Sequence, residues 1–147
     1  MNYKILNIDW DAEPNAPQPE LFVEGFQITI KFLLNPFTND NFEDDEKGEL
    51  IFFNCHKYSF NDCNDEGYYR GQYRYKTAQL PWGDFYELQT NWKNDFPRDS
   101  IVLNEVVDEN NLKHYIFFFR DNTFECVAGG YEFRYLKEKT TQAQQDL

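Results

Sequence analysis

Few residues in this chain are spaced for acid–base chemistry or metal binding. The two histidines, His56 and His114, lie within aromatic runs, and the spacings H-x-x-x-H, H-E-x-x-H and C-x-x-C do not occur. The loop Asp62–Gly67 begins as a calcium-binding EF-hand loop would, but Tyr73 stands where that motif needs a bidentate glutamate. We therefore predict no metal and no cofactor, with a looser oxygen cage in this loop as the alternative.

Nucleophile and general-acid candidates are similarly sparse. The acidic neighbours of Cys63 favour its protonated thiol, and neither a G-x-S-x-G elbow nor a phosphate-binding loop is present. Glu87 and Glu125 differ from the other carboxylates because each lies inside an aromatic strand. Each is suited to act as a general acid or to pair with an arginine, and the ion pair is the favoured reading. We predict no catalytic residue. An enzyme that gathers Glu87, Glu125, His56 or His114 into one cleft is the alternative.

One stretch has the composition of a binding surface. Gly67–Leu88 holds the densest mixture of tyrosine, arginine and tryptophan in the chain, and these residue types dominate binding hot spots. A set of core aromatics with arginines at the rim is the favoured reading of this stretch, and a binding surface is the other. The candidate binding residues are Tyr68, Arg70, Arg74, Trp82 and Tyr86.

The elements that must position these residues are strands. Apolar residues alternate along Leu21–Leu34, which predicts one long strand with a bend at Gly25, and Glu49–Phe60 predicts a second. Lys113–Arg120 and Thr123–Ala128 predict a hairpin around Asp121-Asn122. Further strands are expected at Asn2–Asp9, Tyr68–Tyr75, Asp84–Trp92, Ile101–Val107 and Tyr131–Leu136.

These segments predict a mainly β fold, an antiparallel sheet forming a sandwich or barrel. At most one or two short helices are expected, near Gln89–Asp95 or in the tail. Residues 1–136 should form a single β-rich domain and residues 137–147 a polar C-terminal tail. The 15 Phe and 10 Tyr support this reading, since both types fit a pleated, half-buried surface.

Charge limits the classes of partner. A net charge of −12, from 26 acidic and 14 basic residues, disfavours nucleic acid and the anionic face of a membrane. A basic protein is the attractive alternative, because opposite fields speed encounter. Three cysteines, with no signal peptide and no long apolar run, indicate reduced thiols in a cytoplasm.

The strings GYYRGQYRY, PWGDFYEL and HYIFFFRDNTFECVA resemble a group of small bacterial proteins that has no established activity. The likeness spans roughly residues 60–130. It implies a bacterial source, and it transfers no site residue.

We expect a non-enzymatic, acidic cytoplasmic protein that binds another macromolecule, and an immunity or antitoxin-like inhibitor is one specific form. One alternative is a β-barrel-like protein that binds a small molecule. It requires an aromatic cavity of at least ~300 Å³, lined by residues such as Phe52, Tyr73, Phe117 and Phe124. The other alternative is an enzyme whose site is assembled from distant strands.

Overall fold

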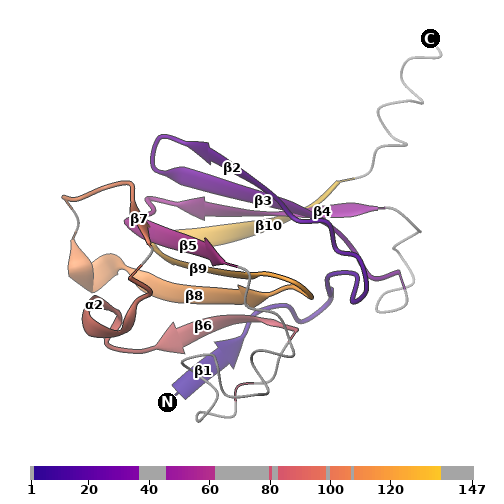
Figure 1. The fold of residues 1–147 in the computed structure, drawn as a ribbon, viewed down its shortest axis with the longest axis horizontal. Coiled ribbons are helices and arrows are strands. Elements are labelled where there is room, and N and C mark those ends of the chain that lie inside the picture. Colours follow the sequence, from indigo (N-terminus) through magenta and orange to yellow (C-terminus); the bar gives the residue numbers. More distant parts are fainter. Residues whose placement is uncertain are drawn as a thin grey trace.

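The computed structural model describes residues 2–36, 46–61, 80, 83–98, 100–106 and 108–136. Within these residues the strands form two antiparallel sheets that pack as a sandwich (Figure 1), which confirms the mainly β prediction. The six-stranded sheet has the order β1 (Asn2–Ile5), β6 (Phe85–Gln89), β8 (Lys113–Phe118), β9 (Thr123–Ala128), β5 (Lys57–Asn61) and β7 (Ile101–Val102). The four-stranded sheet has the order β10 (Gly130–Leu136), β4 (Lys47–Phe53), β3 (Gln27–Leu33) and β2 (Glu20–Glu24).

The run Leu21–Leu34 is a hairpin, so its prediction as one long strand is wrong. Gly25 adopts a φ of +60°, and Glu24 pairs with Gln27 across the turn between β2 and β3. Across this two-residue turn, an even-numbered residue of β2 stands opposite an odd-numbered residue of β3. The even-numbered residues of the two strands therefore point to opposite faces of the sheet. Phe22 therefore lies on the solvent face beside Thr29 and not on the core face. Apolar alternation continues through the turn, which is why the pattern resembled one strand.

The run Glu49–Phe60 also divides, because the chain passes from one sheet to the other. Phe53 pairs with Gly130 in the four-stranded sheet, whereas Lys57 pairs with Val127 in the six-stranded sheet. Residues 54–56 thus stand against only residues 128–129, an extra residue of the kind found in β-bulges. Asn54 accommodates the bend with a φ of +51°. At this corner both chain segments pass from one sheet to the other. β4 pairs with β10 in the four-stranded sheet, and β5 pairs with β9 in the six-stranded sheet.

The remaining elements are close to those expected. The hairpin of β8 and β9 is confirmed, but Phe119 donates its N–H to the carbonyl of Asn122 at 2.9 Å, so the turn centres one residue earlier than predicted. The short helix expected near Gln89–Asp95 is α2 (Trp92–Asp95), and a 3-10 turn, η2, spans Glu109–Asn111. The first, sixth and seventh strands are shorter than their predicted runs. The predicted tail and the strand expected at Tyr68–Tyr75 lie outside the described residues.

Aromatic rings fill the space between the sheets. Phe85 lies 5.5 Å from Phe117 and 5.8 Å from Phe52, measured between ring centroids, so rings from both sheets interlock. The six-stranded sheet is buried on its second face too, where Tyr86, Leu88, Ile116 and Phe118 form a separate cluster. β8 and β9 are consequently the interior strands of the molecule. A polar side chain on their second face has little access to water.

Candidate functional site

Four of the five predicted binding residues, Tyr68, Arg70, Arg74 and Trp82, lie outside the described residues. The fifth, Tyr86, is on β6 and is fully buried in the cluster on the second face of the six-stranded sheet. Its hydroxyl donates to Oδ2 of Asp84 at 3.5 Å. Tyr86 is therefore a core residue with a satisfied polar tip, and it contributes no open surface.

The aromatic residues named for a ligand cavity pack against other side chains. Phe52, Phe117 and Phe124 are fully buried, and Tyr73 lies outside the described residues. The ring centroids of Phe52 and Phe124 are 5.2 Å apart, and those of Phe117 and Phe119 are 4.2 Å apart. Among the described residues, these rings pack closely against one another in the space between the sheets.

The second face of the six-stranded sheet carries a chain of three polar side chains. Nε2 of His114 lies 2.5 Å from Oε2 of Glu125, and Nδ1 of His114 lies 2.5 Å from Oγ1 of Thr90. The side chains of His114 and Glu125 are only 1% and 0% exposed. Thr90, which follows β6, is half-buried and forms the outer end of the chain.

The sheet register explains why these residues meet. His114 on β8 faces Val127 on β9, and Glu125 is two residues before Val127 on the same face. Diagonal neighbours of this kind are within reach of long side chains. The ring of Phe96, directly after α2, covers His114 with centroids 5.4 Å apart. Strand pairing and an aromatic cover thus hold the imidazole in one orientation.

The partners determine which ring nitrogen carries the proton. An ionised Glu125 only accepts hydrogen bonds, so Nε2 of His114 must donate to it. In a neutral ring, Nδ1 then accepts the hydrogen bond from the Thr90 hydroxyl. A hydroxyl, an imidazole and a carboxylate in this order form the connectivity of an activated nucleophile. The same contacts also satisfy buried polar groups in a core.

A lysine borders this buried chain. Lys57 lies on the same face of β5, with Nζ 4.8 Å from the ring centroid of Phe96. Burial lowers the pKa of Lys57, and the charge of Glu125 opposes part of that shift. Besides its contact with His114, Glu125 therefore interacts with the positive charge of Lys57.

Two of the four residues proposed for an enzyme cleft are brought together, namely His114 and Glu125. Glu87 is on the opposite, core-facing side of the sheet, 3.9 Å from Nζ of Lys113. His56 lies at the corner between the sheets, where Nδ1 is 2.6 Å from the carbonyl of Asn104. Glu87 and Glu125 were each predicted to pair with an arginine; among the described residues Glu87 lies near Lys113 and Glu125 contacts His114.

A pocket of about 360 Å³ lies at the end of the sandwich where β8 ends. Its walls are Asp11–Pro14, Gly83–Asp84 and Phe118–Arg120, together with Asn35. Buried Asn7 joins two of these walls, since its Nδ2 donates to Oδ1 of Asp11 at 2.7 Å and to Oδ1 of Asp84 at 3.0 Å. The two carboxylates are thereby held at fixed positions.

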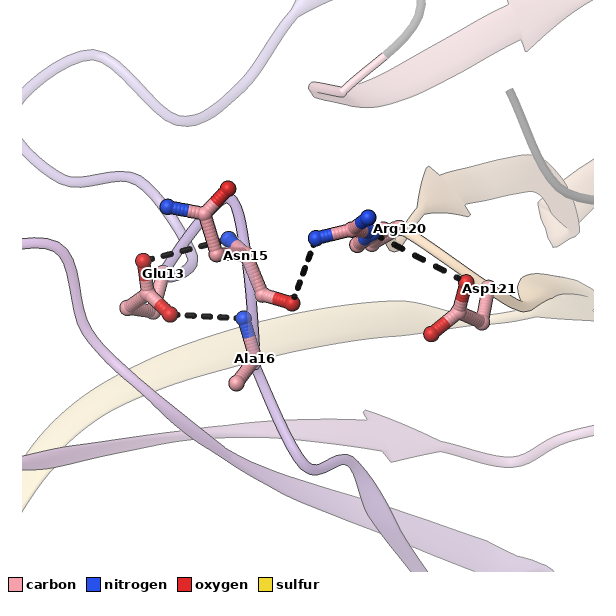
Figure 2. A network of polar contacts seen from close by, with 5 residues as sticks. All are labelled: Glu13, Asn15, Ala16, Arg120 and Asp121. Atoms are coloured by element: carbon pink, nitrogen blue, oxygen red, sulfur yellow. Dashed lines mark hydrogen bonds and ion pairs between the residues drawn. The ribbon is translucent and has the colours of Figure 1, made fainter. Parts of the chain in front are cut away.

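Figure 2 shows how the rim of this pocket is built. Both carboxylate oxygens of Glu13 accept backbone N–H groups, from Asn15 at 3.1 Å and Ala16 at 2.6 Å. Across from them, Nη1 of Arg120 donates to the carbonyl of Asn15 at 3.2 Å, and Nε lies 4.0 Å from Oδ1 of Asp121. These contacts fix the loop Asp11–Glu20 against the β8–β9 turn.

The pocket is acidic and was missed by sequence reasoning. Among its described lining residues, Asp11, Glu13 and Asp84 are acidic and Arg120 is the one cation. Asp11 and Glu13 belong to the run Asp11–Glu20, in which Pro14, Pro17 and Pro19 predict a loop but no binding site. The run of acidic residues preceding those prolines was the available signal, but nothing in the sequence indicated that Asp84 would join it.

No group of three or more metal-binding side chains occurs among the described residues. In the same part of the chain, no helix is long and apolar enough to cross a membrane. No family model, no curated protein and no solved structure matches this chain.

Proposed function

We propose that this chain is a non-enzymatic, acidic protein that binds a basic protein, with a cationic side chain of the partner entering the pocket at Asp11 and Asp84. The observation that carries the proposal is the pocket of about 360 Å³, whose described lining includes three acidic residues and one cation, Arg120. An arginine or lysine head group is complementary to such a lining and pairs well with fixed carboxylates.

The charge of the whole chain supports the same partner class. A net charge of −12 accelerates encounter with a basic surface and repels nucleic acid and anionic membranes. An immunity or antitoxin-like inhibitor that neutralises a basic toxin is one specific form of this function. In that form the protein acts in a bacterial cytoplasm, where its thiols stay reduced.

The test is capture of a partner from native cells with the immobilised protein at low and at high salt. We expect one basic protein to be retained at low salt and released at high salt, because exposed charge pairs are screened. Asp84→Asn should weaken retention, since it removes a pocket charge and keeps an oxygen that accepts from Asn7. Glu105→Gln is the matched control, an exposed charge outside the pocket. If no salt-sensitive partner is retained, the proposal fails.

The hydroxyl–imidazole–carboxylate chain favours one second candidate, an acyl-transfer enzyme with Thr90 as nucleophile. Oγ1 of Thr90 would form a bond to the acyl carbon while its proton passes to Nδ1 of His114 and then to the departing group. A fluorophosphonate probe of serine and threonine nucleophiles tests this candidate. Labelling of the native protein that is lost in Thr90→Val supports the enzyme, and equal labelling of both proteins excludes it.

A further inference from the structure

Strand β2 is one of the two edge strands of the four-stranded sheet, the other being β10. In the described part of the chain it pairs only with β3, so one row of its backbone N–H and C=O groups faces outward. Two apolar side chains on it are strongly exposed, Phe22 at 47% and Val23 at 43%. Figure 1 shows β2 at the open upper edge of the sandwich. An open edge with apolar side chains is a template for adding a strand.

The charges on β2 limit which strand can be added. Glu20 and Glu24 are exposed at its two ends, and three apolar residues lie between them. A second copy of β2, added antiparallel and centred on Phe22, would place Glu20 directly opposite Glu24 at both ends. Like charges directly opposite each other destabilise a strand pair. The edge therefore opposes pairing with a second copy, as natural edge strands commonly do.

The same arrangement favours a strand of opposite charge. A cation opposite Glu20 and another opposite Glu24 would turn both repulsive pairs into attractive ones. Nζ of Lys47 already lies 3.9 Å from a Glu20 oxygen, but the two side chains are 36% and 58% exposed. An exposed pair of this kind is weak and can exchange for another cation.

We propose that β2 is the docking edge for an extended segment of a basic protein, with an apolar centre and a lysine or arginine at each end. This inference rests on the proposed function and names the mode by which the same partner binds. The segment adds as a fifth strand to the four-stranded sheet. Its backbone hydrogen bonds supply affinity, and its flanking cations supply specificity against Glu20 and Glu24.

The first test uses synthetic peptides with blocked ends. Lys-Val-Tyr-Val-Lys is the probe, and Glu-Val-Tyr-Val-Glu is the control of equal length and apolar content. In amide NMR spectra at millimolar peptide and low salt, we expect the lysine peptide to shift Leu21, Phe22 and Val23 and to bind about tenfold more tightly than the control. Shifts located elsewhere, equal binding of both peptides, or no shifts at all would overturn the inference.

The second test needs no partner. Glu24→Lys places a lysine opposite Glu20 of a second copy at both ends of an antiparallel β2 pair. We expect this variant to form a dimer at high concentration in analytical ultracentrifugation, while the native protein stays monomeric. Glu105→Lys changes the net charge equally at an exposed loop and should remain monomeric. The double variant E20K/E24K should also remain monomeric and should prefer the glutamate peptide. A monomeric Glu24→Lys protein contradicts an edge that is open to strand addition.

Retention of the captured partner by variants of the pocket and by variants of β2 separates this inference from the proposed function. Retention that is lost in Asp84→Asn but kept in E20K/E24K removes β2 as the docking edge and leaves the proposed function standing. Loss of retention in both supports one partner that contacts the pocket and the strand. If no salt-sensitive partner is retained while the lysine peptide binds β2, the proposed function fails and the edge remains a site for basic strands.

Discussion

Removing the carboxylate of Glu125 should cost more stability than removing any other carboxylate of the described strands. The side chain is 0% exposed and lies 2.5 Å from Nε2 of His114, which is itself 1% exposed. Glu125→Ala leaves that N–H donor in a cavity closed to water. Breaking a buried pair on one side costs about 3–5 kcal/mol, against about 5–15 kcal/mol for the unfolding of a typical domain.

Urea unfolding followed by circular dichroism measures this loss. For a chain of this size, a loss of about 3–5 kcal/mol corresponds to a melting temperature lower by about 6–20 °C. Glu87→Ala is the matched control on the opposite face of the same sheet. Its side chain is 24% exposed and 3.9 Å from Lys113, so the expected loss is about 1 kcal/mol or less.

A double variant separates the broken contact from the lost volume. His114→Leu combined with Glu125→Leu replaces both polar groups with apolar ones, which for buried pairs is often neutral or stabilising. The double variant should therefore be more stable than Glu125→Ala. The reasoning is refuted if Glu125→Ala unfolds at the same urea concentration as Glu87→Ala, because the pair would then contribute no more than a surface contact.

Three further outcomes are expected. Burial raises the pKa of Cys126, and the neighbouring Cys55 adds to this shift. Iodoacetamide should therefore leave Cys126 unmodified in the native protein and modify it in urea. Modification at the free-thiol rate without urea would contradict this. Burial, reinforced by the charge of Glu87, raises the pKa of Tyr115. As pH rises, the unfolded chain therefore loses this proton before the folded chain does. The free energy of unfolding should fall above about pH 10, by up to about 1.4 kcal/mol per pH unit. Tyr115→Phe should flatten this slope in alkaline urea titrations, and an unchanged slope assigns it to other groups. Gly48→Ala places a Cβ 2.8 Å from the Phe133 ring and should lower the free energy of unfolding by about 1–3 kcal/mol, measured by urea unfolding. Gly130→Ala on β10, whose Cβ meets nothing within 4 Å, should cost much less.

The candidate sites were predictable only in part. His114 and Glu125 stood out in the sequence because each interrupts an aromatic strand, but their contact depends on the register of β8 against β9. A shift of that register by one residue would place the two side chains on opposite faces. The acidic pocket was not predicted, because Asp11 and Asp84 are far apart in the chain and meet through Asn7.

The sequence by itself determined the class of secondary structure, the hairpin of β8 and β9, the short helix and the net negative charge of the chain. These depend on local alternation, turn residues and composition, which act between neighbours in the chain. Only the tertiary structure decided that Leu21–Leu34 folds back at Gly25, that the chain changes sheets at Asn54, and that Tyr86 is buried. Alternation has the same period on both sides of a turn or bulge, so the sheet to which each half belongs depends on contacts between distant strands.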